Sequence, residues 1–370
     1  MADQKVEFAN ALRGLAALSV IVSHYLGVFW GNAVAVAELT GMSRAPVPIP
    51  TMAELALSFP LKWAPFGVAL FFVISGFVIP FSFETYGRLD FIVARFFRIY
   101  PTYLTGLSVS LAVLAVITGI LGVSFPHSIS EILHNYALGT RDIFWVKSVD
   151  GIVWTLEVEL KFYLICMLIA SWLRSGSIAV FTVPVALLGI SCILGAVLPS
   201  SSTTTLFWVA LSSPYILFMF VGVAFNFMYR EKLGGPFGAL AIVAIVVMFW
   251  ASLRYGVFKW HSVLPHYAAA VMVFAMTMRF PVIVTRIPTI GFWAGISYPL
   301  YVVHALIGYS LMVLLLSFGM PAWSVIVVAF AAAVLLATAV HILVEKPSHR
   351  LGRRIAMAIR SAEIEVRQIA

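Results

Sequence analysis

The sequence predicts an all-α integral membrane protein, a bundle of about ten transmembrane helices with both termini in the cytoplasm. Three observations lead to this fold class: the composition, the length of the apolar runs and the distribution of basic residues. Of the 370 residues, 62% are hydrophobic and 10% are charged, whereas an average soluble domain has about 25% charged residues. Because the deficit extends over the whole chain, we expect lipid to surround most of it.

Runs of about 20 apolar residues are the unit that crosses a bilayer as a helix. Clusters of Pro, Gly and charged residues separate ten such runs. The expected spans are 8–30, 64–83, 98–121, 152–173, 177–197, 205–228, 237–254, 264–280, 289–316 and 321–345. The first run is long and has a polar face, so we expect a retained helix and not a cleaved signal peptide. A short interfacial helix is expected within 128–141.

Basic residues decide the orientation of these spans. Of the 23 Lys and Arg residues, 16 fall on one side of the predicted membrane and one, Lys161, lies within a span. The six on the other side are Arg44, Lys62, Arg141, Lys147, Arg254 and Lys259. Cytoplasmic loops carry the excess of Lys and Arg, so the richer side, with both termini, is predicted to be cytoplasmic. These short basic loops give no reason to expect a nucleic acid partner.

Two parts of the chain are expected. Residues 1–345 form the polytopic transmembrane domain, and residues 346–370 form a basic cytoplasmic tail. The tail alternates basic and apolar residues, which predicts an amphipathic helix on the inner leaflet. The two cysteines, Cys166 and Cys192, lie within apolar runs and are interpreted as small core residues. No metal site is expected.

Arg13 and His24 are the first polar residues that attract attention. They are eleven residues apart, about three helical turns plus 20°, so they share one face of the first span about 16 Å apart. A charged group at bilayer depth costs several kcal/mol and is a functional candidate by default. Arg13 is expected at the cytoplasmic rim, and His24 in the outer half of the membrane.

Other spans place polar groups at the same two depths. Glu159 in the fourth span, and Tyr301 and His304 in the ninth, are expected at the level of His24. Arg95 and Arg98 open the third span at the level of Arg13. The sequence therefore predicts a His/Glu/Tyr layer in the outer half and an arginine layer at the cytoplasmic mouth.

The two layers suit an acyl transfer from a phosphate-bearing donor. Guanidinium groups bind phosphate bidentately, and a buried histidine near a carboxylate suits a general base. The gap between the layers is comparable to an extended pantetheine arm. An acyl-CoA held at the cytoplasmic mouth would then present its thioester to His24.

Six sequence strings resemble the acyltransferase-3 family of bacterial integral membrane O-acyltransferases, in the same order and over nearly the whole chain. The pair Arg13 and His24 matches the family's Arg-x10-His pattern. The other strings are Leu70-Phe71-Phe72-Val73-Ile74-Ser75-Gly76-Phe77, Arg95-x-x-Arg98 with Tyr100-Pro101, Trp154-Thr155-Leu156-Glu157-Val158-Glu159-Leu160-Lys161-Phe162-Tyr163, Ser297-Tyr298-Pro299-Leu300-Tyr301-Val302-Val303-His304 and Glu345-Lys346-Pro347. Pro299 and the extra acid Glu157 are departures from the pattern.

The resemblance implies an acyl-CoA donor, most often acetyl-CoA, and a hydroxyl acceptor on a surface, exported or lipid-linked glycan. It implies a multi-pass protein of the bacterial cytoplasmic (inner) membrane, in contact with lipids, and allows a homodimer. The chain is expected to be the stand-alone form, without a fused extracytoplasmic domain. The expected catalytic residues are His24, Glu159, His304 and Tyr301. The expected donor-binding residues are Arg13, Arg95, Arg98 and Ser75.

Structural alternatives exist for several of these residues. Ser75, beside Gly76, has a small packing residue as its alternative role. Glu159 has Lys161 or Arg141 as alternative structural partners, and Glu345 has an arginine of the inner rim. For the whole protein, the alternative function is a transporter or flippase of a lipid-linked sugar or small metabolite, since buried His, Arg and Glu also form proton relays.

Overall fold

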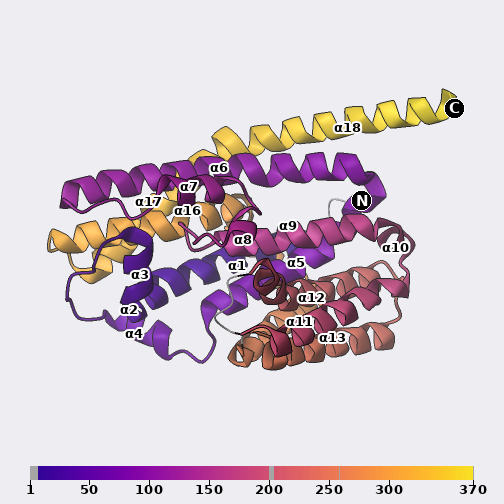
Figure 1. Cartoon of the computed structure of the whole chain (residues 1–370), viewed down its shortest axis with the longest axis horizontal. Helices are drawn as coiled ribbons and strands as arrows, with labels where there is room; N and C mark the ends of the chain where they lie inside the picture. The colour runs from indigo at the N-terminus through magenta and orange to yellow at the C-terminus, as the bar shows by residue number, and fades with distance from the viewer. Residues whose placement is uncertain (1–6, 200–203, 258, 370) are drawn as a thin grey trace.

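The computed structural model describes residues 7–199, 204–257 and 259–369, and these ranges are helical with no β-strand. Most of the long helices lie side by side in one bundle (Figure 1). The short helices α2 (Phe29–Gly31), α3 (Ala33–Thr40) and α4 (Thr51–Ser58) gather at one end of the bundle, and α10 (Ala170–Ser175) lies at the other.

Eight helical stretches of the described chain are long and apolar enough to cross a membrane, and the protein is a multi-pass membrane protein. The first joins α1 (Glu7–Val22), the π-helical segment Ser23–Val28 and α2. The next six are α5 (Trp63–Thr85), α6 (Arg88–Leu121), the stretch Ile178–Val197 that contains α11 (Thr182–Val197), α12 (Thr205–Tyr229), α13 (Gly235–Tyr255) and α16 (Ile290–Ser317). The eighth begins with α17 (Ala322–Val340) and continues through the π-helical segment His341–Glu345 into α18 (Lys346–Ile369).

The two other expected spans are helical but short. Helix α9 (Val153–Leu168) and helix α14 (Leu264–Arg279) have 16 residues each. A helix of that length is about 24 Å long, less than the hydrocarbon core of about 30 Å. The prediction of about ten spans is therefore confirmed for eight.

The connections contain further short helices. The interfacial helix expected within 128–141 is α7 (Ile129–Tyr136), which starts at a capping box of Ser128 and Glu131. Helix α8 (Arg141–Phe144) follows it, and α15 (Val282–Thr285) precedes α16.

Glycines allow the central helices to pack closely. A Cβ atom at Gly76 of α5 would overlap the backbone of α12, and a Cβ at Gly222 of α12 would overlap the backbone of α5. A Cβ at Gly14 of α1 would likewise meet Trp293 and Ala294 of α16. Membrane helices associate through such small residues, and here the contacts join α5 to α12 and α1 to α16.

Three of the basic residues assigned to one side from the sequence lie close together. Arg230 forms an ion pair with Glu84 at 2.6 Å. Arg174 donates to the carbonyl of Phe83 at 2.8 Å, and Lys232 donates to the carbonyl of Arg174 at 2.5 Å. These three residues are therefore also neighbours in space.

The segment predicted as a surface tail forms helix α18. It runs beside α6 and extends past the end of the bundle (Figure 1). His349 bonds to the carbonyl of Arg98 at 3.2 Å, Gly352 packs against Phe97, and Arg360 donates to the carbonyl of Thr85. The first half of α18 is therefore docked on α6, because its small and polar residues find partners there.

Candidate functional site

A cavity of about 310 Å³ lies between α1, α5, α6, α9, α16 and the start of α18. Its polar lining combines basic, acidic and hydroxyl side chains from distant parts of the sequence. Those named in the argument below are Arg13, Ser75, Arg98, Thr155, Glu159, Tyr163, Tyr301, His341, Glu345 and His349, with Asn10 as a further polar member.

Arg13 and Arg98 face this cavity from α1 and α6. Over the described ranges, neither guanidinium has a hydrogen bond or an ion pair with the protein. Partly buried cations without a directly bonded anion are costly, and the two like charges also repel each other across a shared space. The arrangement is suited to an anionic ligand that both arginines contact.

Arg95 lies behind the cavity and is absent from its lining. Its guanidinium bonds to Ser82 and stacks on the rings of Phe91 at 5.3 Å and Tyr163 at 5.6 Å. Such cation–π contacts hold an arginine in place. The structure therefore separates the two predicted arginines of α6, with Arg98 in the cavity and Arg95 in its wall.

Glu159 belongs to the arginine cavity and not to the histidine layer in which we expected it. Its carboxylate accepts hydrogen bonds from Ser75 at 2.6 Å and Tyr163 at 2.5 Å. Gly76 is the packing residue of this string, and Ser75 points toward the cavity. The carboxylate expected beside His24 therefore lies with the arginines.

His24 lies in the π segment Ser23–Val28, next to two aromatic residues of α16. Its Nδ1 is 2.7 Å from the hydroxyl of Tyr309. Its ring centroid is 4.8 Å from that of His304, edge to face. The side chain is partly exposed rather than sealed. Single π-helical turns inside α-helices occur frequently at functional sites.

His304 is fully buried, at 0% exposure. Its Nδ1 faces the carbonyls of Tyr301 at 2.8 Å and Leu300 at 3.2 Å. Because carbonyls only accept, Nδ1 must hold the proton of the neutral ring, and Nε2 is left with a lone pair. No described residue bonds to that Nε2.

Tyr301 connects the cavity with the two histidines. It lines the cavity, its hydroxyl is 2.7 Å from that of Thr155, and its ring centroid is 5.7 Å from that of His304. The expected layers are thus adjacent: the arginines are at one end of the cavity, and the histidines lie beyond Tyr301 at the other.

A second π segment, His341–Glu345, lies beside the arginines. Nδ1 of His341 is 2.5 Å from Glu345, and His349 is 4.0 Å from the same carboxylate. The structural partner of Glu345 is therefore His341 and not the arginine that we expected. Both π segments carry polar residues of the site, and no compositional signal in the sequence marked either one.

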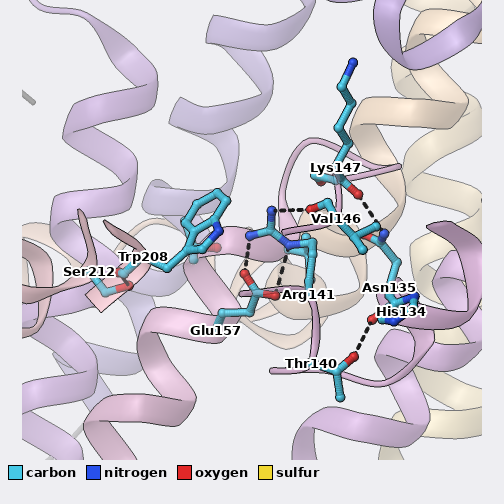
Figure 2. A network of polar contacts seen from close by, with 12 residues as sticks. His134, Asn135, Thr140, Arg141, Val146, Lys147, Glu157, Trp208 and Ser212 are labelled. Carbon is cyan, nitrogen blue, oxygen red and sulfur yellow. Dashed lines mark hydrogen bonds and ion pairs between the residues drawn. The ribbon is translucent and has the colours of Figure 1, made fainter. Parts of the chain in front are cut away.

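A separate polar network surrounds Arg141 (Figure 2). Arg141 is 3% exposed and forms a two-pronged ion pair with Glu157, which is 2% exposed. Its guanidinium also lies 4.8 Å from the centroid of the Trp208 ring. Glu157 is thus the acid that pairs with Arg141. Glu159 is about 200° further around α9 and is left facing the cavity.

Several members of the site were not among the predicted site residues, including Asn10, Tyr163, His349 and Tyr309. Tyr163 ends one of the motif strings, and its spacing of four from Glu159 placed both on one helical face. Tyr309 is five residues beyond His304 on the same helix, about 7.5 Å further along its axis, so the depth count did not select it. Asn10 had no signal beyond its spacing of three from Arg13.

The profile of the acyltransferase-3 family, an acyltransferase domain, matches residues 6–342 of this chain. The chain belongs to this family. The structure therefore belongs to a membrane acyltransferase, an enzyme that takes an acyl group from a donor and transfers it to an acceptor.

One curated relative is nodulation protein 10 of Rhizobium leguminosarum bv. viciae. The two are 34% identical over 147 residues, which is 35% of this chain and 40% of the relative. The match thus spans less than half of the relative's length. No solved structure matches the chain.

Proposed function

We propose that the protein transfers an acetyl group from cytoplasmic acetyl-CoA to a sugar hydroxyl of a surface, exported or lipid-linked glycan, at the bacterial inner membrane. The observation that supports this most is the pair of guanidinium groups, Arg13 and Arg98, that face the cavity without a hydrogen bond or ion pair to a described residue. Within the described chain, they are suited to the phosphates of CoA, since guanidinium binds phosphate through paired hydrogen bonds.

The size of the cavity is consistent with part of the donor. About 310 Å³ is at the lower end of the range for ligand sites, about 300–1,000 Å³. In the proposed complex, the nucleotide stays at the arginine end while the pantetheine arm extends toward Tyr301. Glu159 is an acceptor on this path and would bond to the amide N–H groups of the arm. Arg95 holds the cavity wall through Tyr163.

The reacting group is His24. In the tautomer that this mechanism requires, Nδ1–H donates to the hydroxyl of Tyr309, and the Nε2 lone pair acts as the general base. The acceptor hydroxyl gives its proton to Nε2 while its oxygen bonds to the thioester carbon. The C–S bond then breaks, and the CoA thiolate takes the proton back from His24. The products are an ester and free CoA thiol, and the neutral Nε2 of His304 stabilises the transient imidazolium.

Exchange of His24 tests the chemical step. We expect His24→Ala to abolish transfer while it still binds radiolabelled acetyl-CoA like the wild type, because the base and the phosphate contacts are separate. Binding is measured on purified protein in nanodiscs. Transfer is measured as alkali-labile acetate on the glycans of cells that produce each variant. Full acetylation by His24→Ala would refute the role of His24.

The arginines supply the reciprocal test. Loss of a hydrogen bond to a charged group costs about 1.5–3 kcal/mol, so Arg98→Ala is expected to weaken acetyl-CoA binding by about 10- to 150-fold. The control is Arg88→Ala, an exposed arginine at the start of the same helix. Equal binding by Arg98→Ala and Arg88→Ala would exclude Arg98 as a donor ligand.

A further inference from the structure

A second cavity, of about 270 Å³, lies at the other end of the first transmembrane stretch. It lies between the π segment Ser23–Val28, α2, α4 and the start of α5. Its lining consists of Ser23, Gly27, Val28, Gly31, Asn32, Ala56, Leu57, Lys62 and Trp63. The first cavity and this one have no lining residue in common.

This second cavity is called the outer cavity below. Its distance from the first cavity can be measured along two helices that line both. Arg13, in the first cavity, and Gly27, in the second, are 14 residues apart, about 21 Å along the helix axis. On α5, Ser75 and Trp63 are 12 residues apart, about 18 Å. His24 lines neither cavity, but it belongs to the same π segment as three residues of the second one: Ser23 directly precedes it, and Gly27 and Val28 follow it within one turn.

The lining has the features of a site for a sugar ring. Trp63 stacks on Phe59, with ring centroids 5.1 Å apart, and forms an aromatic wall. Ser23 has no hydrogen-bond partner among the residues that the structure describes. The side-chain oxygen of Asn32 caps α3, which leaves its amide N–H groups available. Ligand sites commonly combine an apolar or aromatic wall with a few polar groups.

Gly27 leaves the space open. A Cβ at this position would meet only Ser23 of its own helix, at 3.7 Å. The cover over the cavity is fixed in place. Leu57 of α4 lies against Gly31, and Lys62 donates to the carbonyls of Leu57 at 2.7 Å and Phe59 at 3.3 Å, which caps the end of α4.

We infer that this outer cavity is the acceptor site, and that it holds the glycosyl unit whose hydroxyl is acylated. The inference rests on the proposed function. The donor enters from the arginine end, and the sugar enters from the opposite end, stacks on Trp63 and presents its hydroxyl to the partly exposed His24. The π segment is the wall between the two substrates.

The test is Gly27→Leu, which adds an apolar side chain at a position where a Cβ meets only Ser23, at 3.7 Å. The control is Gly189→Leu in α11, where a Cβ meets nothing within 4 Å. Each variant is produced in cells that lack the native protein, and alkali-labile acetate on their glycans is measured. Gly27→Leu is expected to reduce acetate to the level of cells without the protein, while purified Gly27→Leu binds radiolabelled acetyl-CoA like the wild type. Gly189→Leu is expected to restore acetate fully.

The aromatic wall gives a graded second test. Trp63→Phe, which keeps a ring, is expected to retain most of the acetate, and Trp63→Ala to lose most of it. A glycan acetate level equal to that of the wild type in Gly27→Leu or Trp63→Ala would overturn the acceptor site but leave the proposed function intact. If even the wild type restores no acetate and binds no acetyl-CoA, the proposed function fails, and the acceptor site fails with it.

Discussion

At the residue scale, His24 has an unusual orienting partner. In many hydrolases and transferases a carboxylate holds the catalytic imidazole, and we expected Glu159 in that place. The structure instead pairs Nδ1 of His24 with the hydroxyl of Tyr309, and Glu159 with Ser75 and Tyr163. A neutral partner avoids a second charge at bilayer depth, where charges are costly.

Tyr309→Phe tests this orienting role. A neutral hydrogen bond contributes about 0.5–1.5 kcal/mol, so kcat is expected to fall by about two- to tenfold while the KM for acetyl-CoA stays constant. Ser310→Ala is the control, because the Ser310 hydroxyl bonds only to the carbonyl of Leu306 in its own helix. A change in KM without a change in kcat would assign Tyr309 to donor binding instead.

At the element scale, helix α9 has two acidic residues with different tasks. The face with Glu157 holds the loop between α7 and α9 through Arg141, whereas the face with Glu159 lines the cavity. The sequence left Lys161 and Arg141 open as structural partners of Glu159, because it does not show which of the two acidic residues faces which neighbour. In the structure, the buried Arg141 pairs with Glu157, and Glu159 faces the cavity instead.

Glu157→Gln tests the structural half of α9. Removal of one partner leaves a buried charge uncompensated, which typically costs about 3–5 kcal/mol. We expect a clear drop in the unfolding temperature, read from thermal aggregation of the purified protein in detergent. The double variant Arg141→Met/Glu157→Leu removes both charges and is expected to recover most of that loss. Unchanged stability of Glu157→Gln would mean that water reaches the pair.

At the scale of the whole molecule, the fold class and the eight longest spans follow from hydropathy and length alone. Two features could not be predicted. The helices α9 and α14 have 16 residues each, fewer than the predicted spans 152–173 and 264–280. The docking of α18 on α6 depends on the contact of Gly352 with Phe97, and such contacts between distant segments leave no periodic signal in the sequence.

The site was predictable to a different degree. Motif strings selected Arg13, Arg98, Glu159, Tyr301 and Ser75, and the structure gathers all five around one cavity. Depth counting along ideal helices could not group them correctly, because helices tilt and the count ignores which face meets which neighbour. The partners of each side chain therefore required the three-dimensional arrangement.

The orientation of the molecule gives a further prediction. In a variant without Cys166 and Cys192, single cysteines replace Leu55 on α4, which is 69% exposed, or Arg88 at the opposite end. By the positive-inside rule, a membrane-impermeant maleimide should label Leu55→Cys in intact cells, and Arg88→Cys only after permeabilisation. The reverse pattern would place the arginine cavity outside the cytoplasm and remove its access to CoA.

The π segment after Val22 has a consequence for how such an enzyme can diversify. The extra residue in this turn sets the rotation of everything beyond it, so an insertion or deletion there would turn the outer cavity while Arg13 and its helix stay in place. In the proposed mechanism, donor recognition and acceptor recognition are therefore joined by one adjustable turn. On that proposal, a lineage could exchange one sugar for another without having to rebuild the contacts that bind the coenzyme.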